Sequence, residues 1–123
     1  GTATMYTAAL DPRITSAYIS GAINTFHDSI MTIKHCVCNY VPHLLEYAEM
    51  PDVAGLIAPR PLMVENGDKD PIYPDFGVKK AVDSLQKIYS AVGHPERLTT
   101  HTFQGVHSWD GEPIAEWLGK QYD

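Results

Sequence analysis

Two loops of this sequence carry side chains that could exchange a proton with a substrate. One loop contains Asp68, Asp70 and Asp75 within "GDKDPIYPDF", and the other contains His107 within "QGVHSWDG". A carboxylate can accept a hydrogen bond from the Nδ1–H of an imidazole, which fixes the tautomer of the ring and stabilises its protonated form. Together the two loops therefore offer the acid and the base of an acid–base–nucleophile triad.

Each of these loops follows a predicted strand. "PLMV" gives a brief apolar run at Leu62–Val64, as expected for a strand buried on both faces, and "RLTTHTFQG" is rich in β-forming residues. Between them, Phe76–Val92 has an apolar stripe at helical spacing, which Gly93 and Pro95 end. A strand–helix–strand order predicts parallel strands, and functional groups of such sheets gather at the carboxyl ends of the strands.

The rest of the chain adds helices and one further strand. We expect a helix over Thr2–Leu10, a strand over Ile14–Ser20 and a last helix opened by Pro113. A helical excursion over Ile23–Ala58 separates the first two strands, with helical spacing in "VPHLLEYAEM" and a short helix from Pro51. This order predicts an α/β fold with a mostly parallel sheet flanked by helices. Three strands would leave both sheet edges unpaired, so we expect them to be part of a larger sheet.

The composition is typical of one soluble globular domain, because the 123 residues are 44% hydrophobic and 20% charged. The formal charge of −6 argues against nucleic acid or an anionic membrane surface as a partner, since both need a basic patch. No apolar run approaches the roughly 20 residues that span a bilayer. We therefore expect a small-molecule substrate, with no nucleic acid and no membrane as partner.

Several longer stretches resemble serine esterases of the α/β-hydrolase superfamily, in particular the bacterial acetyl-xylan-esterase and dienelactone-hydrolase-like group. They are "LDPRITSAYISGAINTF", "HCVCNYVP", "EMPDVAGLIAPRPLMVENGDKDPIYP" and "GVHSWDG", which together span most of the chain. The resemblance implies that residues 1–123 form the C-terminal portion of a single α/β-hydrolase domain, with residues 23–58 as a helical excursion. It also implies carboxylic ester hydrolysis, with Asp70 as the triad acid and His107 as the triad base.

The nucleophile of such enzymes sits in a G-x-S-x-G elbow between a strand and a helix. No G-x-S-x-G occurs in this sequence. We expect the serine and most of the oxyanion hole upstream of Gly1, so that an N-terminal half or another chain completes the sheet and the site. Ser20 and Ser108 do not lie on a strand-to-helix turn, and we expect neither to replace that serine.

Three further side chains are candidates for contact with the substrate. Asn24 and Phe26 follow the end of the first predicted strand, and Trp109 follows the candidate base. Because each lies next to a strand end on the functional side of the sheet, we expect them to line the pocket.

The "HCVC" stretch at residues 35–38 suggests a zinc site. However, C-x-C is not the usual C-x₂₋₄-C spacing of zinc ligands, and no second ligand pair follows at a suitable distance. We therefore expect no metal and no other cofactor, and we expect Cys36 and Cys38 to be free thiols.

Two other functions are compatible with the sequence. The missing nucleophile is also compatible with a non-catalytic fragment or interaction module, which would pair its open sheet edge with another polypeptide. An upstream G-x-S-x-G would exclude that alternative. A serine peptidase on the same fold is the third possibility, and a panel of aryl esters and peptides would separate it from an esterase.

Overall fold

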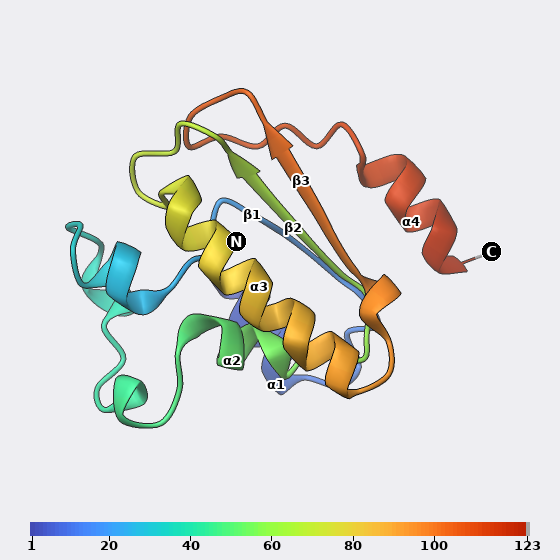
Figure 1. Ribbon diagram of the computed structural model, residues 1–123, viewed down its shortest axis with the longest axis horizontal. Helices are drawn as coiled ribbons and strands as arrows, with labels where there is room; N and C mark the ends of the chain where they lie inside the picture. The colour runs from blue at the N-terminus through green and yellow to red at the C-terminus, as the bar shows by residue number, and fades with distance from the viewer. Residues whose placement is uncertain (123) are drawn as a thin grey trace.

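Three parallel strands form the centre of the computed structural model, which describes residues 1–122. β1 (Ala17–Ser20), β2 (Leu62–Gly67) and β3 (Leu98–Phe103) lie in the spatial order β1-β2-β3 (Figure 1). Four α-helices accompany them: α1 (Thr2–Leu10), α2 (Met50–Gly55), α3 (Asp75–Ala91) and α4 (Ile114–Tyr122). The predicted α/β class with a parallel sheet is confirmed.

The two faces of the sheet are covered unequally. Helices α1, α2 and α3 pack together on one face, and α4 lies on the other (Figure 1). Ile19 and Val64 point into the apolar core that the three helices close, because successive side chains of a strand alternate between faces. On the α4 face, the ring of Trp117 packs edge-on against Tyr18, with 5.9 Å between the ring centroids.

The strands differ in length from the sequence-based expectation because pairing depends on the partner strand. β1 begins at Ala17 and not at Ile14, since its ladder starts opposite Leu62, where β2 begins. β2 continues past Val64 to Gly67. Three residues extend it, and two of them, Glu65 and Asn66, are polar and buried, so the short apolar run hid half of the strand.

Residues 23–58 form the expected excursion between β1 and β2, but it contains less α-helix than the spacing predicts. A π-helix (Phe26–Ile30) and two 3₁₀ turns (Val37–Asn39 and Leu44–Glu46) precede α2. The helix expected in "VPHLLEYAEM" is therefore wrong in extent. Pro42 disfavours helical backbone in the residue before it, and His43 has a left-handed conformation with φ of 63°.

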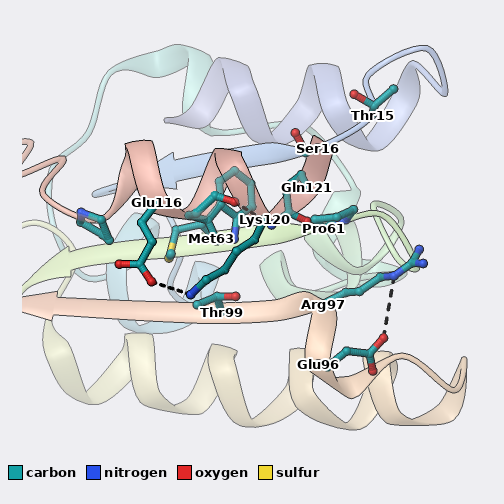
Figure 2. A pocket seen from close by; sticks show the side chains of 12 residues that line it. Thr15, Ser16, Pro61, Met63, Glu96, Arg97, Thr99, Glu116, Lys120 and Gln121 are labelled. Atoms are coloured by element: carbon teal, nitrogen blue, oxygen red, sulfur yellow. Dashed lines mark hydrogen bonds and ion pairs between the residues drawn. The ribbon is translucent and has the colours of Figure 1, made fainter. Parts of the chain in front are cut away.

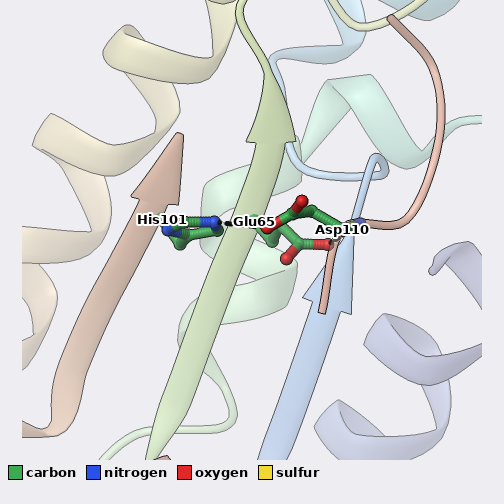
Figure 3. Close-up of side chains that lie close together, drawn as sticks. All are labelled: Glu65, His101 and Asp110. Atoms are coloured by element: carbon green, nitrogen blue, oxygen red, sulfur yellow. Dashed lines mark hydrogen bonds and ion pairs between the residues drawn. The ribbon is translucent and has the colours of Figure 1, made fainter. Parts of the chain in front are cut away.

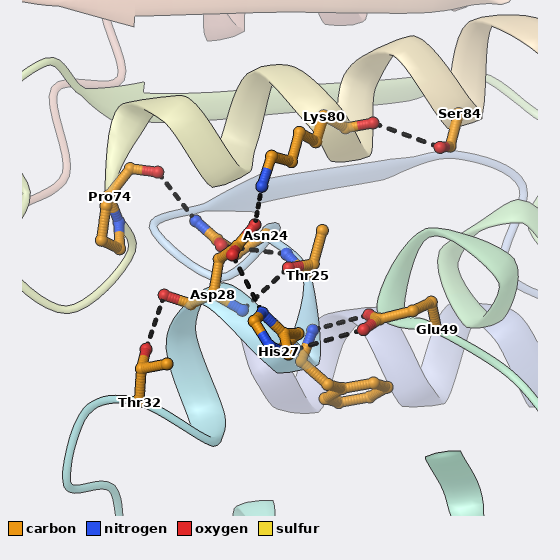
Figure 4. Close-up of polar contacts among 10 residues, drawn as sticks. Asn24, Thr25, His27, Asp28, Thr32, Glu49, Pro74, Lys80 and Ser84 are labelled. Carbon is orange, nitrogen blue, oxygen red and sulfur yellow. Dashed lines mark hydrogen bonds and ion pairs between the residues drawn. The ribbon is translucent and has the colours of Figure 1, made fainter. Parts of the chain in front are cut away.

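Two carboxylates fasten the excursion to its neighbours (Figure 4). Glu49 caps α2 and also accepts the backbone N–H groups of Phe26 (2.6 Å) and His27 (3.2 Å). Asp28 pairs with Lys80 of α3 at 2.7 Å. The segment is thus tied to both helices although it has little regular structure of its own.

Within residues 1–122, β1 and β3 each pair with a strand on one side only. Both edges of the sheet therefore carry unpaired backbone groups, which can pair with a further strand. Among the same residues, no helix has the length and apolar character needed to cross a membrane.

Candidate active site

Asp70 and His107 meet at the carboxyl edge of the sheet. Asp70 lies in the loop after β2 and His107 in the loop after β3, and Figure 1 shows these two loops side by side at the same end of the strands. The Nδ1 atom of His107 is 2.7 Å from Oδ2 of Asp70. With an ionised carboxylate, which only accepts hydrogen bonds, Nδ1 would donate and the lone pair of Nε2 would stay free.

The carboxylate of Asp70 is held by its own loop. Its second oxygen, Oδ1, accepts the backbone N–H groups of Ile72 (2.8 Å) and Tyr73 (2.9 Å). The side chain of Asp70 is fully buried, whereas 41% of the His107 side chain is exposed. A buried, oriented carboxylate behind a half-exposed imidazole is an arrangement that supports general-base catalysis by the imidazole.

The imidazole of His107 packs against Tyr73 and lies close to Gly21. Its ring stacks on Tyr73, with centroids 5.7 Å apart and an interplanar angle of 17°. A Cβ atom at Gly21 would lie 3.1 Å from Cε1 of His107, so the glycine leaves room for the ring. Gly21 also has a φ of 57°, in the left-handed region that favours glycine.

The loop after β2 that carries the candidate acid Asp70 (the acid loop) and the loop after β3 that carries the candidate base His107 (the base loop) are bonded to each other directly. The N–H groups of Asp68 and Lys69 donate to the carbonyls of Phe103 and Gly105, both at 2.9 Å. In return, the N–H of Gly105 donates to Oδ1 of Asp68 at 3.0 Å. A Cβ at Gly67 would collide with the carbonyl oxygen of Val106, so this close approach requires glycine.

These contacts separate the three aspartates that the sequence offers as the acid. Asp68 ties the loops together, and Asp75 begins α3 and pairs with Lys79 at 2.6 Å. Asp70 is the one of the three that is bonded to His107.

A hollow of about 440 Å³ lies in front of His107. It is lined by Tyr18 and Ser20 of β1, by Gly21, by Ser108 and Trp109 beside the base, by Ile114, and by Gly1 and Thr4 at the start of α1. His107 therefore borders the same space as the N-terminal end of α1. Trp109, a predicted substrate contact, is 65% exposed and forms part of this wall.

Asn24 and Phe26, the other two predicted substrate contacts, lie in the interior. Asn24 is fully buried, its Nδ2 donates to the carbonyl of Pro74 at 2.9 Å, and its Oδ1 accepts the N–H of Thr25. Phe26 belongs to the apolar core. Asn24 ties the excursion to the loop after β2 and Phe26 packs it into the core, so neither side chain lines the hollow beside His107.

His35 is a second histidine close to Asp70 and His107. From the sequence it was a candidate only as a zinc ligand. Its ring packs edge-on against Tyr73, 5.5 Å between centroids, and its Nε2 is 3.1 Å from Oγ of Ser29. Burial lowers the pKa of His35, and the nearby charge of His107 lowers it further. The excursion therefore reaches the site through His35, while the neighbouring Cys36 and Cys38 are exposed free thiols.

Within residues 1–122, one group of side chains has its ligand atoms close enough to hold a metal ion. Glu65, His101 and Asp110 bring one such atom each within 4.8 Å of one another (Figure 3). However, Asp110 Oδ2 is already paired with His101 Nε2 at 3.0 Å. Both oxygens of Glu65 also accept hydrogen bonds from protein donors, so the group is satisfied without a cation.

A larger hollow, about 590 Å³, lies at the opposite end of the strands. Figure 2 shows it between α4 and the sheet, near the residues that precede the strands, such as Ser16, Pro61 and Arg97. Because functional groups collect at the carboxyl ends of parallel strands, its size alone does not make it the reaction site.

No protein-family model and no curated protein matches the sequence. Solved esterase structures do match the fold. A carbohydrate esterase family 15 glucuronoyl esterase from Caldicellulosiruptor kristjansonii aligns with a TM-score of 0.78 and 16% identity, over 98% of this chain and 40% of that one. Methylesterase BT1017 aligns with a TM-score of 0.71 and 21% identity, over 94% of this chain and 26% of that one.

A glucuronoyl esterase catalytic domain from Hypocrea jecorina aligns with a TM-score of 0.71 and 13% identity, over 94% of this chain and 39% of that one. The chain thus spans two fifths or less of the length of these three structures. Identities this low establish architecture and not activity. The chain therefore shares its fold with part of each of these three solved esterase structures, as the predicted α/β class with a parallel sheet leads one to expect.

Proposed function

We propose that this chain is part of a carboxylic ester hydrolase that uses a Ser-His-Asp triad. The observation that carries the proposal is the bond of 2.7 Å between Nδ1 of His107 and Oδ2 of Asp70, with His107 bordering an open hollow. In this arrangement Asp70 fixes the tautomer and Nε2 of His107 is free to accept a proton.

The nucleophilic serine is supplied by a segment outside these 123 residues. His107 shares its hollow with Gly1 and Thr4 at the start of α1, and a nucleophile elbow joins a strand to the start of a helix. The serine oxygen would attack the ester carbonyl while His107 takes its proton, and the histidine would then return the proton to the leaving alcohol. Water, activated by the same histidine, would cleave the acyl-enzyme.

The substrate class is a small carboxylic ester. Among proteins of similar fold are glucuronoyl esterases and a methylesterase. We further propose that a strand outside the chain pairs with the open edge of β1, so that the sheet continues past the hollow.

Labelling and turnover of the intact gene product test the proposal together. It should hydrolyse p-nitrophenyl acetate, and a fluorophosphonate should stop turnover by modifying one serine that peptide mass spectrometry locates outside residues 1–123. A gene product that neither reacts with the fluorophosphonate nor hydrolyses aryl esters would contradict the proposal. Such a result would favour a non-catalytic module.

A further inference from the structure

Glu65 is a buried carboxylate that the proposed reaction does not use. It lies on the face of β2 turned toward α4, two residues before the strand ends, and is 1% exposed. Burying a charge costs free energy unless surrounding groups bond to it. Glu65 must therefore be matched by donors from the elements around it.

Four donors meet the carboxylate of Glu65, and they come from two different parts of the chain. From β1, the hydroxyls of Tyr18 and Ser20 donate to Oε2 and Oε1 at 2.5 and 2.6 Å. From the loop after β3, the N–H groups of Gly111 and Asp110 donate to the same two oxygens at 2.9 and 3.3 Å. Each oxygen accepts one hydroxyl and one backbone N–H.

These bonds decide the charge state of the carboxyl. Burial alone would raise the pKa of Glu65, but the hydrogen bonds from Ser20, Tyr18 and the two backbone N–H groups outweigh it and lower the pKa. The group is therefore ionised at neutral pH, and hydrogen bonds to an ionised acceptor are roughly twice as strong as neutral ones.

The loop that Glu65 holds is the one that carries His107. This segment, Gly105–Gly111, is fastened at its start through Gly105 to the acid loop. It is fastened at its end by Glu65, and by Asp110, whose side chain pairs with His101 of β3 (Figure 3). Between the two points of attachment, Val106 and Trp109 are exposed. His107 thus lies between two fixed points of this segment, Gly105 at its start and Asp110–Gly111 at its end.

We propose that Glu65 is a positioning residue for the triad base: it fixes the backbone at Asp110 and Gly111 and thereby the aim of His107. This inference rests on the proposed function, and Glu65 itself touches no substrate. A misplacement of about 1 Å at a reacting group can cost roughly 10²-fold in rate. Loss of this anchor should therefore lower turnover beyond what the loss of stability explains.

The substitution Glu65→Gln tests the role with little change of shape. The glutamine amide keeps one acceptor oxygen and replaces the other with an NH₂ donor. A hydroxyl facing that NH₂ can rotate and accept, but a backbone N–H cannot. At least one of the two hydrogen bonds from the backbone N–H groups of Asp110 and Gly111 is therefore lost.

The experiment compares the intact gene product with three variants. Glu65→Gln should lower kcat for p-nitrophenyl acetate by between about tenfold and about 10²-fold, with KM within about threefold. Glu116→Gln makes the same charge change on α4, where Glu116 pairs with Lys120 away from the site, and should leave kcat unchanged. Leu85→Val loosens the core under α3 and controls for lost stability.

A second readout does not depend on turnover. With labelled histidine, the His107 ring resonances should shift or split in Glu65→Gln and stay in place in the two controls. If the wild type hydrolyses no ester but these resonances still move, the proposed function fails and the positioning role stands. If the wild type is active and Glu65→Gln matches Glu116→Gln in kcat and in His107 resonances, the positioning role is overturned. A loss of kcat that Leu85→Val reproduces at equal melting temperature also overturns it.

Discussion

Oδ2 of Asp70 faces Nδ1 of His107 at 2.7 Å while Oδ1 of the same carboxylate accepts the N–H groups of Ile72 and Tyr73. Both oxygens of the carboxylate are therefore engaged, Oδ1 by its own loop and Oδ2 by His107. Because Oδ1 accepts both backbone bonds, the carboxylate is oriented so that Oδ2 is the oxygen that faces Nδ1 of His107.

This relationship makes Asp70→Asn an informative substitution. The two backbone donors keep the amide oxygen on their side, so the NH₂ group must face His107. Nδ1 then has to accept, Nε2 carries the proton, and the ring can no longer act as the base. We expect a loss of about 10⁴-fold in kcat, as for the same change in a serine protease triad.

Asp68→Asn is the matched control for that experiment, since it makes the same change two residues earlier. The side-chain amide of this variant would keep the oxygen that accepts the N–H of Gly105. We expect a loss below about tenfold. The kcat of both variants would be measured by steady-state kinetics. Equal losses of kcat would argue that the loop tolerates no amide at either position and that Asp70 does not orient His107 for catalysis.

His107→Ala should remove the base outright. We expect kcat/KM for an aryl ester to fall by at least about 10³-fold, since triad members lost singly cost that much or more. His94→Ala is the control, because His94 lies after α3 beside Glu96. Turnover by His107→Ala within about tenfold of the wild type would exclude it as the base.

Two glycines with positive φ allow packing against the base to be separated from backbone conformation. Gly21 and Gly93 have φ of 57° and 82°, but only Gly21 would place its Cβ against His107. Alanine at either site should cost about 1–2 kcal/mol of stability from the left-handed backbone. Only Gly21→Ala should lower kcat, by about tenfold or more, because it also displaces the imidazole. Thermal melts and kinetics on both variants check this.

The anchor of the excursion on α3 should respond to acid. The hydrogen bond from Lys80, followed by that from His27, lowers the pKa of Asp28 from 3.8 to about 2. A carboxyl with a lowered pKa in the folded state stabilises the fold fully above its unfolded value and loses that contribution as pH falls through the folded one. The contribution should thus be complete above about pH 4 and disappear toward pH 2.

Hydrogen exchange of residues 23–58 between pH 5 and pH 2.5 would measure this effect. The wild type should lose protection in that segment as pH falls. Asp28→Asn should show reduced protection at pH 5 and little further change. A segment whose protection falls equally in both proteins would show that other carboxyls govern it.

The sequence predicted that Asp70 and His107 lie close together because their positions follow from the topology of the sheet, and the structure confirms that contact. A helix between two parallel strands puts the loops after both strands at one edge, so Asp70 and His107 had to be neighbours. The choice among the three aspartates needed either the resemblance or coordinates, since all three lie within eight residues after the same strand and hydrophobic spacing does not separate them.

Other features were hidden because they depend on register or on side-chain direction. Glu65 reads as the end of an apolar run, and its role emerges only when Ser20 lies opposite it in the ladder. Asn24 follows a strand end as a site residue would, yet its side chain turns inward to Pro74. The hydrophobic spacing of one strand does not give its register with the neighbouring strand, and it does not give the direction of a polar side chain in a loop.

The bonds between the acid loop and the base loop have a consequence for redesign. Lys69 donates to Gly105, Gly105 donates to Asp68, and Gly67 admits no larger residue against Val106. A loop transplanted from another protein of this fold at either position would arrive without its complementary partner. Segments 67–70 and 103–107 therefore have to be exchanged together, and a chimera that replaces only one of them should lose the bonds between the two loops.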